Sequence, residues 1–141
     1  MSKEFAYYQL SVKALIVNNG KIFTLFTPDG YIDFPGGRVD IDEQGDNLEN
    51  ILNREIDEEL GKSCKIKLNN VAFVTNRHYT IASNIQYVIT VFYNSKFENS
   101  NIQLSSEHSS YKWLTYIDML AYKDKFISKD EYIQFEKYCL K

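Results

Sequence analysis

Three glutamates near residue 57 have the spacing of a carboxylate cluster. In the segment REIDEELG, residues 54–61, Glu55, Glu58 and Glu59 lie three and four positions apart. On a helix these side chains share one face, whereas Asp57 points away from it. Their repulsion, at a helix end whose backbone dipole is also negative, destabilises the helix until a cation neutralises them. Carboxylate oxygens favour a hard divalent ion such as Mg²⁺, which also takes water and phosphate oxygens as ligands.

The loop before this helix is rich in glycine, and the region around it is strongly acidic. Pro35, Gly36 and Gly37 break regular structure, and bare glycine backbone can approach a ligand closely. A merely solvated acidic surface is the alternative, but it does not explain acids at the unfavourable end of a helix. We expect this region to attract cations and to repel nucleic acid. Nine of the 19 acids lie here, against the single base Arg54: Asp40, Asp42, Glu43, Asp46, Glu49, Glu55, Asp57, Glu58 and Glu59.

The segments PGGRV, GD at Gly45, and REIDEELG together resemble the signature of the Nudix hydrolases, Gx5Ex7REUxEExGU, where U is a bulky apolar residue. The required positions of its second half are filled by Arg54, Glu55, Ile56, Glu58, Glu59 and Gly61. The sequence departs from the signature in its first half, where Asp46 replaces Glu and eight residues rather than five separate Gly37 from Asp46. Lys62 also replaces the last apolar residue. The loop therefore holds a three-residue insertion, at Ile41 to Glu43 or its neighbours.

This resemblance implies an enzyme that hydrolyses a nucleoside diphosphate linked to another group, with Mg²⁺ or Mn²⁺ as its cofactor. It implies that Glu55, Glu58 and Glu59 bind the metal and that Arg54 orients a glutamate through an ion pair. The backbone at Gly36 and Gly37 would then approach the metal or a phosphate.

A later segment, LSSEHSSYKWL, is similar to a stretch found in many small Nudix enzymes. The similarity implies that Glu107 supplies a further metal ligand or a general base, with an ordinary exposed loop glutamate as the alternative. The segment also favours nucleoside triphosphates or dinucleoside polyphosphates as substrates.

Three further residues are candidates for substrate binding. Arg38 and Arg77 lie near glycines or strand ends, where ligands usually bind, and could contact phosphates. Tyr79 offers a flat face on which a nucleobase could stack.

Other aromatic and titratable residues are weaker candidates. Tyr31, Phe34 and Tyr87 could also stack on a base, although we expect packing against strands or core for each of them. His78 and His108 could act as acid or base, but a single loop histidine is more often a polar surface residue, and we expect that for both.

Two other functions compete with hydrolysis. DIDEQGDNLENI, residues 40–51, places oxygen side chains and Gly45 as in an EF-hand loop, but Ile51 stands where a bidentate Glu is needed. No helix can precede this loop, because Pro35 and two glycines intervene. A non-catalytic nucleotide-binding domain is the second alternative, and the complete set of Arg54 and its glutamates argues against it.

The elements that must position these residues follow from hydrophobic periodicity and turn signals. We expect strands over 7–17, 21–27, 31–34, 66–75, 85–93 and 111–114, with loops over 38–45, 76–84 and 94–106. A helix over 48–60 would be capped by Asp46 or Asn47 and end at Gly61, and further helices would start at Thr115 and at Ser128, whose capping box includes Glu131. The pattern predicts one domain over residues 1–141, an α/β fold with a mixed sheet flanked by helices. The Nudix resemblance implies an α/β/α sandwich.

Composition sets limits on partners and compartment. The chain has 141 residues, 44% of them hydrophobic and 25% charged, which is typical of a folded soluble domain. We expect a small nucleotide as partner rather than nucleic acid or membrane, because no apolar run approaches the roughly 20 residues of a membrane span. The two cysteines have no metal-type spacing and the start of the sequence lacks an apolar signal, so we expect a reducing cytoplasm. Monomer and homodimer both remain open.

Overall fold

The structure is a computed structural model that describes residues 3–140, and its centre is a seven-stranded mixed sheet. The strands run in the order β3-β2-β1-β6-β5, with β4 paired to β1 and β7 paired to β2. β1 is parallel to β6 and antiparallel to β2 and β4, so the predicted mixed sheet is confirmed. The strand bounds are β1 Gln9–Asn18, β2 Lys21–Phe26, β3 Ile32–Asp33, β4 Gly36–Arg38, β5 Cys64–Ile81, β6 Asn84–Ser100 and β7 Ser110–Thr115.

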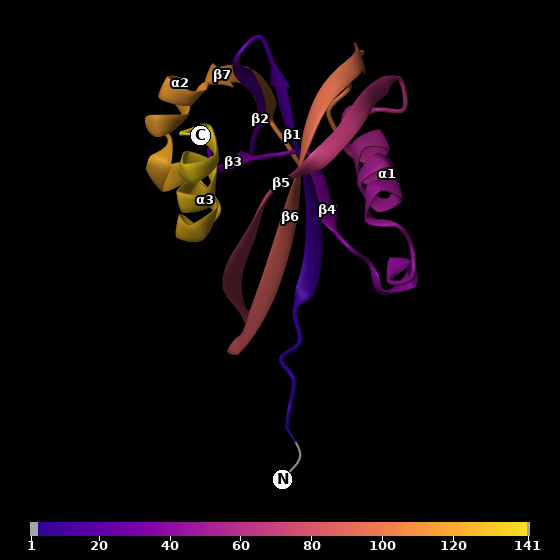
Figure 1. The fold of residues 1–141 in the computed structure, drawn as a ribbon, viewed down its shortest axis with the longest axis vertical. Helices are drawn as coiled ribbons and strands as arrows, with labels where there is room; N and C mark the ends of the chain where they lie inside the picture. Colours follow the sequence, from indigo (N-terminus) through magenta and orange to yellow (C-terminus); the bar gives the residue numbers. More distant parts are fainter. Residues whose placement is uncertain (1–2, 141) are drawn as a thin grey trace.

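Helices cover the sheet on two sides. Helix α1 (Leu48–Leu60) packs on one face, while α2 (Tyr116–Leu120) and α3 (Lys129–Cys139) lie on the other (Figure 1). Side chains of β1 alternate between the two layers, because successive strand residues point to opposite faces. Val12 and Ala14 join the core under α1, whereas Leu15 joins the core under α3. The predicted α/β/α sandwich is confirmed.

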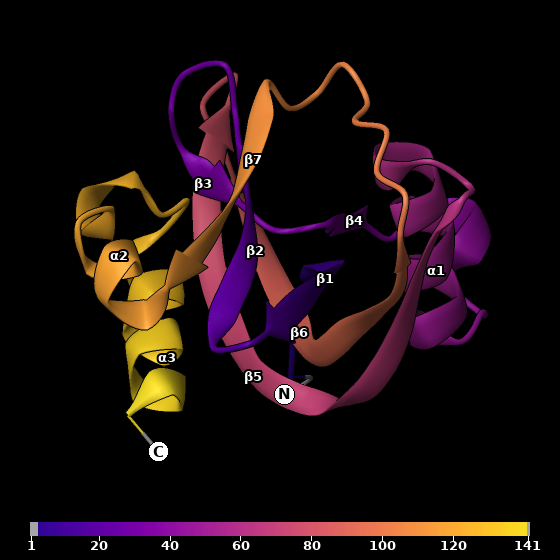
Figure 2. The same cartoon turned by 90° about the horizontal axis from the view of Figure 1, so that it is seen from above.

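The long hairpin of β5 and β6 differs from the prediction. Residues 76–84 and 94–100 were expected to be loops, yet the two strands pair without interruption from Asn76, opposite Ile89, to Ile81, opposite Asn84. A tight turn at Ala82 and Ser83, both with positive φ, joins them. Much of this hairpin is exposed, and backbone hydrogen bonds hold its two strands together. Its side chains therefore need not alternate between apolar and polar, and the sequence lacks the period that predicts a strand. Figure 2 shows its strong curvature around the rest of the sheet.

Two shorter segments also differ from the expected loops. Gly36–Arg38 forms β4, because its backbone pairs with Ser11, Val12 and Lys13 of β1. Within the loop expected over 38–45, Ile41–Glu43 forms a 3-10 turn. Glycine is disfavoured in strands by propensity, but here the close pairing with β1 overrides that preference. Among the described residues, no helix is long and apolar enough to cross a membrane.

Helix α3 carries a buried acid, Glu131. Ser128 caps the helix by accepting a hydrogen bond from the Glu131 amide at 3.1 Å, while the Glu131 carboxylate is buried and its Oε2 has no hydrogen-bond partner among residues 3–140. Burial, aided by the charge of Asp33 and opposed by those of Lys13 and Arg77, raises the pKa of this carboxyl to about 7. The folded chain therefore keeps a proton that the unfolded chain releases between pH 4.5 and 7.

Glu131→Gln should change the pH dependence of stability. Because the folded state binds the extra proton, the free energy of unfolding of the wild type falls as pH rises through this window. The variant has no such carboxyl, so its free energy of unfolding should not fall for this reason. Between pH 4.5 and 8, the variant's free energy of unfolding relative to that of the wild type should therefore rise by about 3 kcal/mol, as measured by urea denaturation. Glu136→Gln, on the same helix, is the control for the removal of a less buried carboxylate. Parallel curves for Glu131→Gln would contradict the prediction.

Candidate active site

Helix α1 is anchored so that its acidic face meets β4. Asn47, one of the two predicted caps, accepts hydrogen bonds from the amides of Glu49 and Asn50, at 2.8 and 3.3 Å. The apolar face, Ile51, Leu52, Ile56 and Leu60, is buried against the sheet. Gly61 ends the helix with φ of 89°, a conformation that favours glycine. This packing fixes the rotation of the helix and therefore the direction of its glutamates.

The three glutamates of the predicted cluster lie in different environments. The side chain of Glu59 is 4% exposed, and its Oε1 accepts a hydrogen bond from the Gly36 amide at 2.9 Å. Glu55 is 14% exposed and Glu58 is 60% exposed. Burial raises the pKa of Glu55, and it raises the pKa of Glu59 to about 7. Ionising Glu55 and Glu59 is therefore costly in the absence of a cation, and burial rather than their mutual repulsion is the main cause.

Arg54 links two of these glutamates. One terminal nitrogen lies 3.0 Å from Glu55 Oε1 and the other lies 2.6 Å from Glu58 Oε1. The planar guanidinium therefore fixes both carboxylates relative to each other. This contact is the ion pair that the family resemblance implies.

The two glycines of β4 let the helix approach the sheet. A Cβ on Gly36, whose φ is 136°, would lie 2.0 Å from the backbone oxygen of Val12. A Cβ on Gly37 would instead lie 2.6 Å from Oε2 of Glu55. Gly37 therefore sits directly beneath a predicted metal ligand, and only the absence of a side chain leaves room for that carboxylate.

His108 is buried, so the expectation that it is a surface residue is wrong. Its Nε2 lies 3.1 Å from Asp33 Oδ2, and its Nδ1 lies 3.5 Å from Glu59 Oε2. Asp33 also pairs with the Lys13 amine at 3.0 Å. Although burial opposes ionisation, Lys13 and the His108 hydrogen bond hold the pKa of Asp33 at about 2. A lysine within the apolar run of β1 was the one local signal of this network in the sequence.

The loop between β6 and β7 carries Glu107 to the same place. Backbone hydrogen bonds from Gln103 to Leu60 and from Ser105 to Glu59, at 2.8 and 2.9 Å, tie this loop to the end of α1. One potential ligand atom each from Glu59, Glu107 and His108 then lies within 4.8 Å of the others. Glu59 Oε2 and His108 Nδ1 are both buried without a hydrogen-bond partner among the described residues. A cation would satisfy such a set of ligand atoms, so these three residues fit a divalent metal ion. Of the three glutamates predicted on the helix, this group includes Glu59 but not Glu55 or Glu58.

A pocket of about 420 Å³ opens beside these groups. Lys13, Arg38 and Arg77 contribute positive charge to its lining, which also includes Asp33, the ion-pair partner of Lys13. Gly37, Glu107 and His108 line the same pocket. Arg38, Arg77, Gly37 and Glu107 were predicted from the sequence, whereas Lys13 was not. Basic groups facing an acidic cluster suit a phosphate chain that carries a metal ion.

Tyr79 is joined to this pocket through Arg38. The Arg38 guanidinium lies 4.4 Å from the centre of the Tyr79 ring and hydrogen bonds to its hydroxyl. Gln9 Oε1 accepts hydrogen bonds from both residues at 3.2 Å. Arg38 therefore covers one face of the ring that the sequence offered for base stacking.

The remaining candidates have varied positions. Phe34 is buried in the core and His78 is exposed, as expected. Tyr31 and Tyr87 are partly exposed and lie outside the core, and each ring packs against a neighbouring side chain. Lys125 lies over the Tyr31 ring, and Tyr8 meets the Tyr87 ring edge to face.

The structure also weighs against the calcium-binding alternative. Asp40 and Glu43 close a capping box on the 3-10 turn, and Ile51, at the position of the required bidentate ligand, is buried in the core. Asp40 and Glu43 are therefore engaged within the turn, and Ile51 supplies no oxygen ligand for calcium.

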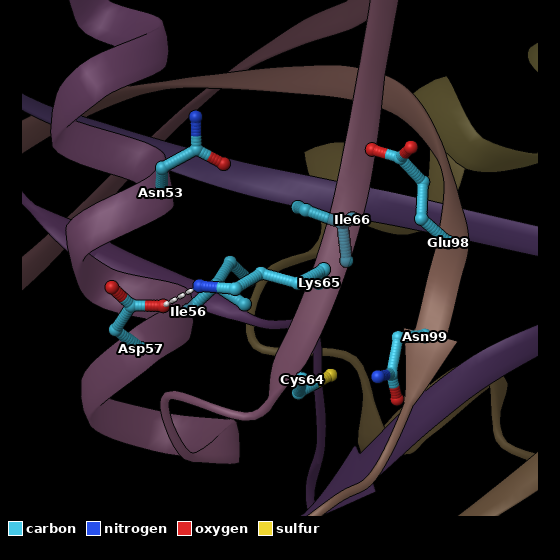
Figure 3. Close-up of a pocket in the computed structure, with 8 residues that line it drawn as sticks. All are labelled: Asn53, Ile56, Asp57, Cys64, Lys65, Ile66, Glu98 and Asn99. Atoms are coloured by element: carbon cyan, nitrogen blue, oxygen red, sulfur yellow. Dashed lines mark ion pairs between the residues drawn. The ribbon is translucent and has the colours of Figure 1, made fainter.

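A second pocket of about 420 Å³ lies on the other side of α1 (Figure 3). Asp57 faces it and pairs with Lys65 at 3.8 Å, which confirms that Asp57 points away from the three glutamates. Burial raises the pKa of the Cys64 thiol there, so that thiol is a poor nucleophile. None of the predicted site residues lines this pocket.

Comparisons with known proteins identify the family and the fold of this chain. The family model Nudt16-like, described as U8 snoRNA-decapping enzyme-like, matches residues 5–113. Among solved structures, the MutT protein from Methanosarcina mazei is 25% identical with a TM-score of 0.73, and the match covers 93% of this chain and 92% of that one.

Two further solved structures share the fold. A Nudix hydrolase from Nitrosomonas europaea is 17% identical with a TM-score of 0.72, covering 94% of this chain and 88% of that one. The dihydroneopterin triphosphate pyrophosphohydrolase of E. coli is 16% identical with a TM-score of 0.65, covering 96% and 99%. Among curated proteins, none matches the sequence significantly. The chain thus belongs to the Nudix hydrolase family and is a Nudix-type pyrophosphohydrolase.

Proposed function

We propose that this protein cleaves the pyrophosphate bond of a nucleoside triphosphate or a dinucleoside polyphosphate, with Mg²⁺ as cofactor and Mn²⁺ as a substitute. The observation that carries the proposal is the pocket lined by three basic side chains, Lys13, Arg38 and Arg77, together with Glu107, which groups with Glu59. Several basic side chains in one pocket match a chain of several phosphates. The segment around Glu107 and His108 favours the same substrate class.

Each residue has a definite task in this proposal. Glu55, Glu58 and Glu59 would hold the metal, with Gly37 leaving space for Glu55. When bound, the divalent ion would lower the pKa of the attacking water and offset charge on the phosphates. Glu107, exposed at the edge of the pocket, would accept a proton from water or complete the ligand set.

The basic residues would position the substrate. Arg38 and Arg77 would bind phosphate oxygens in line for attack at phosphorus, and Arg54 would keep Glu55 and Glu58 in place. Tyr79 would hold Arg38 at the pocket and offer its free face to the base.

A panel of substrates with Mg²⁺ tests this proposal. Purified protein should turn over nucleoside triphosphates or dinucleoside polyphosphates faster than nucleotide sugars, ADP-ribose or capped RNA. Pyrophosphate as product would identify attack at the α phosphorus of a triphosphate. Faster turnover of capped RNA would contradict the proposed substrate class and identify capped RNA as the substrate instead. A panel without any metal-dependent turnover would favour the non-catalytic alternative.

Mg²⁺ should also stabilise the protein in the absence of substrate. Binding to the folded state alone adds RT ln(1 + [Mg²⁺]/Kd) to the free energy of unfolding, about 2.7 kcal/mol at 100 times Kd. We expect millimolar Mg²⁺ to raise the melting temperature by several degrees and EDTA to reverse the shift. A melting temperature that does not respond to either would contradict the metal site.

We further propose that residues 1–141 act as one Nudix domain in the cytoplasm, on small nucleotides. The family match over residues 5–113 and the packing of α3 against the sheet support one folded unit. Cys64 and Cys139 are both free thiols, which suits a reducing compartment.

A further inference from the structure

A further pocket lies beside the candidate active site and shares one basic residue with it. This side pocket has a volume of about 620 Å³ and opens between the start of β1, the end of β4 and the 3-10 turn Ile41–Glu43 (Figure 1). Arg38 lines the side pocket and also the basic pocket that contains Lys13 and Arg77. A ligand that binds Arg38 in the basic pocket can therefore extend into the side pocket.

The side pocket is lined largely by apolar and aromatic side chains, and part of its wall is held in place by the core. Val39 and Leu48 pack against the hydrophobic cluster under α1. The Val39 amide donates a hydrogen bond to the Leu10 carbonyl at 2.8 Å, which ties the end of β4 to the start of β1. The apolar and aromatic residues of the lining are Tyr8, Leu10, Val39, Ile41 and Leu48. The pocket is thus formed before any ligand binds.

Two side chains of this lining expose apolar surface. Ile41 is 80% exposed and Tyr8 is 50% exposed. Asp40 and Glu43 close a capping box on the 3-10 turn, so Ile41 is presented by a fixed backbone. The amide group of Gln44 lines the same pocket and offers a polar contact. A concave apolar and aromatic surface with a few polar groups is the usual form of a site for an organic ligand group.

A second aromatic surface lies on Tyr79, outside the lining of the side pocket. Gln9 Oε1 accepts hydrogen bonds from both Arg38 and Tyr79 at 3.2 Å, and the Arg38 guanidinium lies 4.4 Å from the centre of the Tyr79 ring. Arg38 therefore connects the two aromatic surfaces. A nucleoside triphosphate has one base, whereas a dinucleoside polyphosphate has a base at each end of its phosphate chain. Two aromatic surfaces joined by a basic side chain match the second molecule.

We propose that the side pocket binds the second nucleoside of a dinucleoside polyphosphate, whose phosphate chain lies in the basic pocket and whose first base lies against Tyr79. This inference rests on the proposed function and selects one of its two substrate classes. Arg38 binds the phosphate at the junction, because it lines both pockets. Tyr8 stacks on the second base and Ile41 covers it, so these two residues determine specificity.

Tyr8→Ser and Ile41→Ser test this assignment, with diadenosine tetraphosphate and ATP as the two probes. For each variant, the ratio of kcat/KM for diadenosine tetraphosphate to kcat/KM for ATP should fall by about tenfold, the effect of losing one apolar contact in a binding pocket. The loss should appear as a higher KM for diadenosine tetraphosphate. Ile117→Ser is the matched control, because Ile117 is 75% exposed on α2 and lies outside this pocket. Its ratio should equal that of the wild type.

Several outcomes would overturn the inference while leaving metal-dependent cleavage of triphosphates intact. These are wild-type protein that cleaves ATP but not diadenosine tetraphosphate, and variants that lose activity equally on both substrates or on neither. A wild-type dimer that Tyr8→Ser or Ile41→Ser dissociates, with an unchanged substrate ratio, would assign the pocket to a second copy of the chain and also overturn it. Wild-type protein that cleaves neither substrate with Mg²⁺ would instead refute the proposed function. Melting temperatures show that each variant is folded before its kinetics are compared.

Discussion

Glu59→Gln should reduce kcat/KM for the best substrate by about 10³-fold or more, the effect expected when a buried group that stabilises the transition state is lost. Glutamine keeps the acceptor for the Gly36 amide at Oε1. It replaces the unpartnered Oε2 with an amide nitrogen, which cannot bind a cation. Steady-state kinetics over a range of Mg²⁺ concentrations measures the loss. Glu58→Gln should have a similar effect, because its largely exposed carboxylate, held by Arg54 through Oε1, is a proposed metal ligand.

Asp57→Asn is the matched control on the same helix. Asp57 lies on the opposite face and pairs with Lys65, so its variant should keep turnover within about twofold of the wild type. Glu59→Gln should fold at least as well as the wild type at pH 8 without metal, because ionising the buried carboxyl costs stability above its raised pKa. Turnover that survives in Glu59→Gln and Glu58→Gln would disprove the catalytic assignment.

Gly36→Ala should destabilise the fold by about 3–5 kcal/mol, whereas Gly37→Ala should leave the fold nearly intact and weaken metal binding. A methyl group on Gly36 would collide with the backbone of Val12 in the buried strand β1, and that backbone cannot move without disrupting the sheet. The φ of 136° at Gly36 would add backbone strain for any other residue. For a methyl group on Gly37, the three nearest atoms all belong to the flexible carboxylate end of Glu55. That collision displaces a predicted metal ligand.

Urea denaturation and Mn²⁺ titration separate these two outcomes. Gly45→Ala is the control, because a Cβ there would meet no atom within 4 Å. Stability of Gly37→Ala should stay within about 1 kcal/mol of the wild type while its Mn²⁺ affinity falls by about tenfold. Equal stability losses in Gly36→Ala and Gly37→Ala would show that the two glycines serve packing alone.

The carboxylate helix was predictable because its signals are local. The cap at Asn47, the stop at Gly61 and the spacing of Glu55, Glu58 and Glu59 all lie within one short segment. Helical geometry converts such spacing directly into a shared face. The family signature and the mixed sheet could be predicted for the same reason, since periodicity and turn residues are read from neighbours in sequence.

The contacts of His108 and Lys13 could not be predicted from local sequence patterns. His108 contacts Asp33 and Glu59, which lie 75 and 49 positions away in sequence, and no local pattern distinguishes it from the exposed His78. The strand form of Gly36–Arg38 likewise depends on pairing with β1, against the propensity of glycine. The extended β5–β6 hairpin is held by backbone hydrogen bonds that any side chains permit.

The sequence by itself determined the carboxylate helix, the glycine loop before it and the family's class of chemistry, because these depend on residue types at short spacing. Only the tertiary structure decided which distant groups surround Glu59: His108, Asp33 and Lys13. Those contacts follow from how the sheet and the loops fold over α1, and spacing along the chain carries no information about them.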